Sequence, residues 1–159
     1  MKRVNSILNN NKYIAVTKKI ESYEENREFC RHNISHFLTV SRILYILTLE
    51  EDLKIDKDIV YGVGLLHDIG RSLQYENGTP HEKGSVILAQ EILEESGYNN
   101  SEIVIINQAI LAHRKYSEQG TIFEKLAYRA DKLSRECYEC SASHECKWNE
   151  EDKNIYIKY

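Results

Sequence analysis

The sequence predicts an all-α fold, a compact bundle of five to seven helices. Only one proline and seven glycines interrupt the 159 residues, which leaves room for long helices. Apolar residues recur at helical spacing in most of the chain. Hydrophobic residues make up 42% and charged residues 29%, an ordinary globular balance. We therefore expect a single domain over 1–159, with a core at about 28–136 and a tail at 137–159.

Six helices account for this pattern. The first should lie largely on the surface, and the second is long and amphipathic, with Phe37, Val40 and Leu44 on one stripe. The third, KDIVYGVGLLHDI, is nearly all apolar after its first turn, so we expect it at the centre. The expected helices cover about 12–24, 28–50, 57–69, 81–96, 101–114 and 120–136.

Local signals suggest where some of these helices begin and end. Gly70 is placed to end the central helix in a left-handed conformation. Ser101, followed by Glu102, is a candidate helix cap. The clearest loop is QYENGTP, which contains Asn77-Gly78 and the single proline. The last residues, NIYIKY, predict a short terminal strand.

Charge and targeting signals exclude several classes of protein. The net charge of -4 argues against non-specific nucleic-acid binding. The start of the chain is basic but lacks the apolar region of a secretion signal, and no apolar run reaches membrane-spanning length. We therefore expect a cytoplasmic protein without membrane association, in which cysteines bind metal more readily than they form disulfides.

Four histidines and two aspartates occupy positions that solvent would not favour. Each lies on the inner stripe of a predicted helix or at its end, and burial of so many polar groups is costly unless they are paired or bind metal. A single buried histidine is usually a satisfied core residue, but six such groups spread over five predicted helices indicate a metal site. The residues are His36, His67, Asp68, His81, His113 and Asp131.

The pattern resembles the HD-domain superfamily of metal-dependent phosphohydrolases. An early helical His36, the doublet His67-Asp68 in LLHDIGR and a late Asp131 in ADK carry the resemblance, which covers roughly 28–136. It implies that these four residues bind a first metal ion. His81 and His113 take the places of the second-metal ligands in two-metal members, among which the chain looks most similar to bacterial hydrolases of dinucleoside polyphosphates.

The chemistry of these ligands agrees with that resemblance. Imidazole nitrogen combined with carboxylate oxygen suits two divalent transition-metal ions, such as Fe, Mn, Co, Ni or Zn. Asp68 is the natural carboxylate to bridge them, and a metal pair activates water for attack on a phosphoester or phosphoanhydride. We expect a small phosphorylated substrate, a nucleotide above all. The sequence leaves the oligomeric state open.

Basic residues beside the ligands fit a phosphate substrate. We expect Arg71 and Lys132, together with Asp68, to act in catalysis, since the resemblance also places basic residues there. Lys83 and Arg114 are either phosphate ligands or surface charges. His32 lies one helical turn before His36, so it either supports the site or is an ordinary polar residue.

The cysteines form a possible second metal site. Cys137 and Cys140 are spaced as zinc ligands often are, with Cys146 close behind. Cys30 lies six residues before His36 and Cys137 six after Asp131, which favours a meeting of all four at one end of the bundle. Structural zinc or an iron–sulfur cluster would suit them, with His144 able to replace Cys30, and free thiols are the alternative.

Two other functions remain open. Some two-metal members of the superfamily are di-iron oxygenases, which the ligands alone do not exclude. A non-catalytic protein that binds a nucleotide is the second, although such a sensor need not keep all six ligands.

Overall fold

The protein is all-helical, as the sequence predicts, and the computed structural model describes all 159 residues. Two 3-10 turns, Ser143–Glu145 and Glu150–Asp152, lie in the tail, and no strand forms. None of the helices combines the length and the apolar character that a membrane span requires. The α-helices are α1 (Lys2–Leu8), α2 (Asn11–Tyr23), α3 (Ile34–Glu50), α4 (Lys57–Leu66), α5 (Arg71–Asn77), α6 (His81–Glu95), α7 (Asn100–Ala112) and α8 (Ile122–Leu133).

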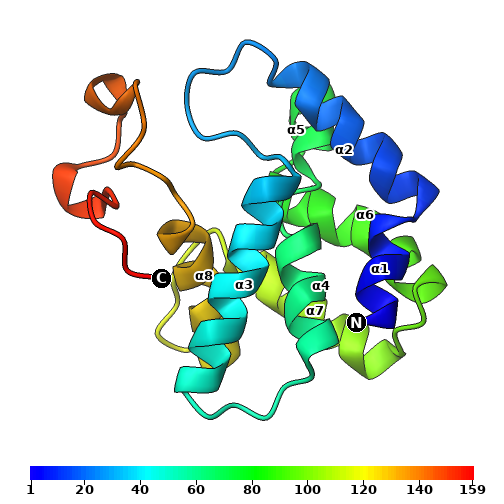
Figure 1. Ribbon diagram of the computed structural model, residues 1–159. Coiled ribbons are helices and arrows are strands. Elements are labelled where there is room, and N and C mark those ends of the chain that lie inside the picture. The colour runs from blue at the N-terminus through cyan, green and yellow to red at the C-terminus, as the bar shows by residue number, and fades with distance from the viewer.

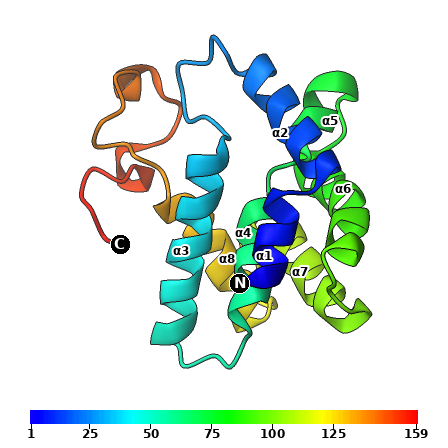
Figure 2. The same ribbon diagram turned by 45° about the vertical axis from the view of Figure 1, so that its right-hand side comes forward.

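Five of these helices form the bundle that carries the candidate site. α3 packs against α4 and α8, and α7 contacts α4, α6 and α8. The helices α1, α2 and α5 pack on the α4 and α6 side, whereas the tail lies on the opposite side, beside α3 and α8 (Figures 1 and 2). α4 is buried along most of its length, as its apolar sequence predicts.

Side-chain caps set the helix starts. The Asn33 side chain accepts a hydrogen bond from the backbone NH of His36, so α3 begins at Ile34 and not near residue 28. Asn99 and Glu102 form a capping box at α7, which makes Asn99 the cap in place of the expected Ser101. Thr121 and Glu124 form the same motif at α8. Each box satisfies backbone NH groups that the first helical turn leaves free.

Glycines permit two close contacts in the core. A Cβ on Gly64 would lie 2.6 Å from the Ser41 Cα, so α3 and α4 touch backbone to backbone there. A Cβ on Gly70 would lie 2.1 Å from the His81 carbonyl oxygen. Gly70 itself is right-handed, with φ of -68°, so the expected left-handed helix end is wrong. The fold requires the small size of Gly70, which lets α5 and α6 approach each other closely.

Two further expectations about local structure are corrected. The predicted loop over 74–80 is mostly helix, because α5 continues to Asn77 and only Gly78, at φ of 78°, turns the chain. The terminal NIYIKY segment is not a strand. It has no neighbouring strand to pair with, and a single strand gains no ladder hydrogen bonds.

Candidate metal centre

The six predicted histidines and aspartates meet at the centre of the bundle, brought there by helix ends. His36 lies in the first turn of α3, and His81 is the first residue of α6. His67 and His113 are the residues that follow α4 and α7, and Asp131 lies in the last turn of α8. Five helices thus each point one terminus at the same place.

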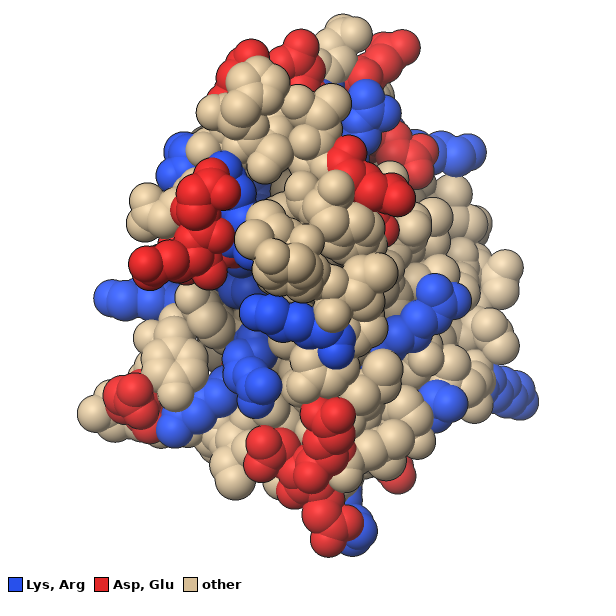
Figure 3. Space-filling model, turned by 60° about the vertical axis from the view of Figure 1, so that its left-hand side comes forward, with Lys and Arg blue, Asp and Glu red and all other residues tan.

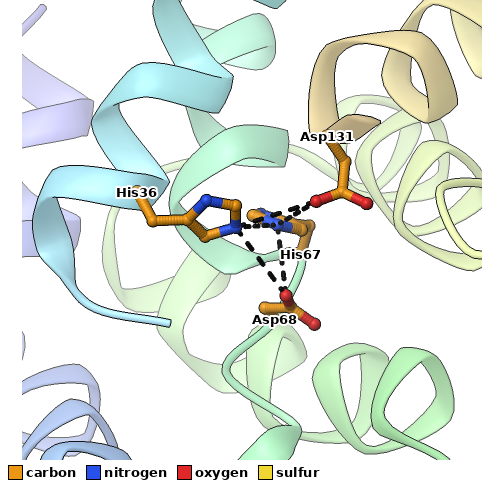
Figure 4. Close-up of side chains that lie close together, drawn as sticks. All are labelled: His36, His67, Asp68 and Asp131. Carbon is orange, nitrogen blue, oxygen red and sulfur yellow. Dashed lines mark hydrogen bonds and ion pairs between the residues drawn. The ribbon is translucent and has the colours of Figure 1, made fainter. Parts of the chain in front are cut away.

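The first group of ligand atoms comprises His36, His67, Asp68 and Asp131 (Figure 4). The Nε2 atoms of His36 and His67 are 3.3 Å apart. The Asp131 Oδ1 lies 3.7 Å from each of them. The Asp68 Oδ2 lies 3.9 Å from the His36 Nε2 and 3.5 Å from the His67 Nε2. These four atoms therefore surround a space in which one cation would contact all of them.

The second group comprises Asp68, His81 and His113. The Nε2 atoms of the two histidines are 3.2 Å apart. The Asp68 Oδ1 lies 3.4 Å from His81 Nε2 and 3.7 Å from His113 Nε2. Asp68 thus turns one carboxylate oxygen to each group, so the two groups share this residue and no other.

Backbone contacts fix how two of the imidazoles are protonated. His67 Nδ1 lies 2.8 Å from the Gly64 carbonyl oxygen, and His113 Nδ1 lies 2.5 Å from that of Ile110. A carbonyl only accepts, so each Nδ1 donates and each neutral ring keeps a lone pair on Nε2. Those lone pairs face carboxylate oxygens, which also carry lone pairs. A cation between them resolves this repulsion, so the donors present fit divalent metal.

The protonation equilibria of four of the six groups point the same way. Burial lowers the pKa of His36 to about 4 and that of His81 to about 3, so both rings are neutral at pH 7. At His113 the contact with Asp68 outweighs burial and raises the pKa. Burial alone would raise the pKa of Asp68, but the neighbouring His67 and Arg71 hold it well below its usual range. The pKa of Asp131 is likewise held low, against burial, by His67 and Lys132. Neutral imidazoles and ionised carboxylates are the forms that bind metal.

Arg71 and Lys132 contact the two aspartates directly. Arg71 Nε donates to Asp68 Oδ1 over 3.1 Å, and Lys132 Nζ donates to Asp131 Oδ2 over 2.5 Å. Both side chains also line a cavity of about 550 Å³ that opens onto His36 and Asp131. They are therefore placed to orient the aspartates and to face a bound molecule.

His32 makes more contacts around the site than the sequence indicates. Its backbone NH donates to Glu24 Oε2 over 2.7 Å, and its ring Nδ1 lies 2.5 Å from Glu24 Oε1. Tyr75 also donates to Glu24, over 2.6 Å. The Nε2 of the buried His32 lies 3.5 Å from Asp68 Oδ2 and lines the same cavity. Glu24 and Tyr75 had no sequence signal, since nothing distinguishes one acidic residue or tyrosine among many.

The cavity wall is mainly basic, with two aromatic side chains. The tail and the loop before α3 supply Arg27, Phe29, Arg135, Lys147 and Trp148, none of which the sequence analysis singled out. The Arg135 guanidinium lies over the Trp148 ring, 4.4 Å from its centre. Figure 3 shows Lys and Arg side chains in a band across the tail side of the molecule, with acidic groups above and below.

The other basic candidates lie away from this cavity. Lys83 is exposed, and Arg114 forms an ion pair with Glu82 at 2.9 Å. Neither lines the cavity, so the geometry favours the surface reading for both. The cysteines are all unpaired thiols, and Cys30 and Cys146 lie on the cavity wall.

Comparisons with known proteins agree with this geometry. A Clostridium beijerinckii protein is 50% identical over 159 residues, the full length of both chains. Ribonuclease Y of Clostridium botulinum is 33% identical over 101 residues, and ribonuclease Y 1 of Pediococcus pentosaceus is 31% identical over 117. The chain spans 18% and 21% of these two ribonucleases.

A solved structure shares the fold. A predicted HD superfamily hydrolase from an uncultured Thermotogales bacterium superimposes with a TM-score of 0.65 at 22% identity, covering 91% of this chain and 80% of that one. The HD domain profile matches residues 33–136, well over half of the chain, and this span contains all six ligands of the candidate centre. The chain belongs to the HD-domain family.

Proposed function

We propose that the protein hydrolyses a phosphoester or a nucleotide phosphoanhydride at a centre of two divalent transition-metal ions. HD-domain membership supports a metal-dependent phosphohydrolase in general terms. The observation that carries the two-metal assignment is the orientation of Asp68, whose two oxygens face separate groups of ligands. His36, His67, Asp68 and Asp131 hold one ion, and Asp68, His81 and His113 hold the other.

The chain's own groups prepare this centre for hydrolysis. Two bound divalent ions supply an acidified water nucleophile and neutralise phosphoryl oxygens. The Gly64 and Ile110 carbonyls hold the Nε2 lone pairs of His67 and His113 toward the ions. Arg71 aligns Asp68, and Lys132 aligns Asp131. The Arg71 and Lys132 side chains both line the cavity. Their remaining NH groups are available to phosphate oxygens.

The cavity favours a small phosphorylated substrate. Its volume of about 550 Å³ and its five basic side chains, Arg27, Arg71, Lys132, Arg135 and Lys147, suit a molecule with several phosphate charges. Trp148 and Phe29 add aromatic surface on which a nucleobase would stack. These features support a nucleotide over a simple phosphomonoester.

The decisive experiment measures hydrolysis and metal together. The protein is loaded separately with Mn²⁺, Fe²⁺, Co²⁺, Ni²⁺ or Zn²⁺ and assayed for product release from a panel. The panel contains nucleotides, dinucleoside polyphosphates, sugar phosphates and a short RNA, since two relatives are named as ribonucleases. We expect about two ions per chain at this centre, with turnover that a chelator abolishes.

Asp68→Ala provides the critical variant. It removes the shared carboxylate, so turnover should fall by about 100-fold or more and metal should be lost. Asp52→Asn, at a site with 84% side-chain exposure, is the matched control and should change neither. Near-full turnover in Asp68→Ala would show that the metal-hydroxide mechanism is wrong.

The same preparation separates the two alternatives. A di-iron oxygenase would consume dioxygen with a candidate substrate and would be inactive under nitrogen, whereas hydrolysis needs no dioxygen. A nucleotide-binding protein without activity would bind a panel nucleotide and release no product with any of the metals.

A further inference from the structure

Four cysteines from three separate segments gather beside the metal centre. Cys30 belongs to the loop between α2 and α3, Cys137 and Cys140 follow α8, and Cys146 follows the turn Ser143–Glu145. Figures 1 and 2 both show this loop and the tail side by side at the same end of the bundle. All four are free thiols, so the arrangement is not explained by a disulfide.

Cavities and charge interactions connect the four side chains. Cys30 and Cys140 line one cavity, and Cys30 and Cys146 line the neighbouring one that opens onto His36. Burial, followed by the nearby Cys137 and Cys140, raises the pKa of the Cys30 thiol. Cys30 therefore shares one cavity wall with Cys140 and another with Cys146.

The backbone around the three tail cysteines folds into consecutive turns. The backbone NH of Cys140 donates to the Cys137 carbonyl over 3.4 Å, and that of Ser143 donates to Cys140 over 3.1 Å. Cys146 donates in turn to Ser143 over 3.3 Å. These consecutive turns keep three cysteines on one short stretch of chain, a spacing found in structural zinc sites.

Few contacts hold the tail in place against the bundle. In 137–159 only Ala142, Lys153 and Asn154 are buried, while large side chains such as Tyr156 and Ile157 are exposed at 74% and 75%. Asn154 donates to the Lys132 and Arg135 carbonyls over 2.8 and 3.0 Å, and few such contacts attach the segment. A segment with so little apolar burial depends on a cross-link for a fixed position.

Nearby cations would balance thiolate charge. Four thiolates around a divalent ion carry a net charge of about -2. Lys153 is buried and its Nζ donates to the Ser143 carbonyl over 2.8 Å. Its pKa is raised, first by Glu150 and in smaller part by Cys146 and Cys137. The positive charge of Arg135 similarly acts on Cys30.

We infer that Cys30, Cys137, Cys140 and Cys146 bind one zinc ion, which fastens the tail to the loop before α3. No three of the four sulfurs lie within 4.8 Å of one another, so zinc would draw them inward. Tetrahedral bonds near 2.3 Å require sulfurs about 3.8 Å apart. The ion would also fix the cavity wall, because Cys30 lies two residues from His32 and Cys146 two from Trp148.

Cobalt substitution tests this inference directly. The full-length protein is prepared without oxygen, stripped with a chelator and reloaded with Co²⁺ or Zn²⁺. Tetrahedral cobalt thiolate gives strong sulfur-to-metal charge-transfer bands, which a His/Asp centre lacks. We expect these bands in the wild-type protein and in His81→Ala, and we expect Cys140→Ser to lose them together with about one bound ion per chain. Ser143→Ala, in the same tail, is the matched control and should keep both.

Further measurements decide each ligand and the identity of the ion. Cys30→Ser should lose the bands and His144→Ala should keep them; the reverse result would overturn the assignment of Cys30. Trp148 is the single tryptophan, so its emission should shift when the chelator removes metal from wild type but not in Cys140→Ser. Wild-type protein without charge-transfer bands would overturn the site. Iron with acid-labile sulfide in the oxygen-free preparation would overturn zinc.

Discussion

Asp68 is the residue on which both halves of the centre depend, and its position follows from local backbone. The carboxylate follows His67 in the turn that ends α4, which lets two adjacent side chains enter the site. The LLHDIG segment made this doublet predictable. The sequence did not predict which group of ligands each Asp68 oxygen faces, because this depends on α6 and α7 approaching from the far side of the bundle.

A substitution at Lys132 tests substrate binding separately from metal binding. Its amino group contacts the Asp131 oxygen that faces away from His36 and His67, and it lines the cavity. We expect Lys132→Ala to raise KM for a phosphorylated substrate by about 10-fold and to keep both ions, because Asp131 Oδ1 is unaffected. Steady-state kinetics with metal analysis checks this. Loss of an ion in the variant would show that Lys132 is needed for metal binding.

The Glu24 carboxylate is the buried anchor of His32. Its pKa is lowered to about 2, against burial, by its contacts with His32 and Tyr75. Glu24→Gln keeps the shape but removes the charge, so His32 should lose its fixed orientation beside Asp68. We expect kcat to fall by about 10-fold at unchanged metal content, and Tyr75→Phe, which leaves the His32 contacts intact, to have a smaller effect. Equal kcat in Glu24→Gln and wild type would make the contact purely structural.

At the scale of elements, the contact between α3 and α4 depends on one glycine. A Cβ on Gly64 would lie within 2.6 Å of the Ser41 backbone, so Gly64→Ala must separate the helices. We expect unfolding free energy to fall by about 1–3 kcal/mol and metal affinity to fall with it, since α4 presents His67. Urea denaturation and metal titration measure the two effects.

Gly62→Ala is the control within the same helix. Its Cβ would lie 3.1 Å from the flexible tip of Ile106, and alanine favours helix by about 1 kcal/mol over glycine. We expect a change close to zero. If the two variants lost the same stability, the close approach of α3 and α4 would not be the cause.

The helix types were predictable and several boundaries were not. Apolar periodicity identified all six long helices, because each buries one face. The short α1 lacks room for a periodic pattern, and α5 contains residues typical of a loop. α4 ends at Leu66, before Gly70, and Gly70 is needed for the approach of His81, a tertiary contact that no local signal records.

For the whole molecule, burial of neutral imidazoles predicts sensitivity to acid. His36 has a folded pKa of about 4 and His81 of about 3, below the ordinary value of 6.5. Between pH 6.5 and 4 the unfolded chain binds protons at these histidines and the folded chain does not, so stability falls as pH falls. The pKa values of Glu24, Asp68 and Asp131 are also lowered, so these groups likewise make stability fall as the pH drops below their ordinary pKa values.

We expect the metal-free protein to lose roughly 3 kcal/mol from His36 alone between pH 6.5 and 4. Urea unfolding at steps across this range measures the loss. His36→Asn removes one titrating ring and should make the profile less steep, with the contribution of His81 remaining. A stability that stayed constant to pH 4 in the wild type would contradict the neutral state of the buried imidazoles.

The six ligands are spread from His36 to Asp131, and this spread has a consequence for biosynthesis. A chain emerging from the ribosome presents α3 and α4 well before α8. The first ion therefore gains its last protein donor, Asp131, only after α8 has been made. Until then the first group of ligands is incomplete, so stable loading of that site has to wait for α8.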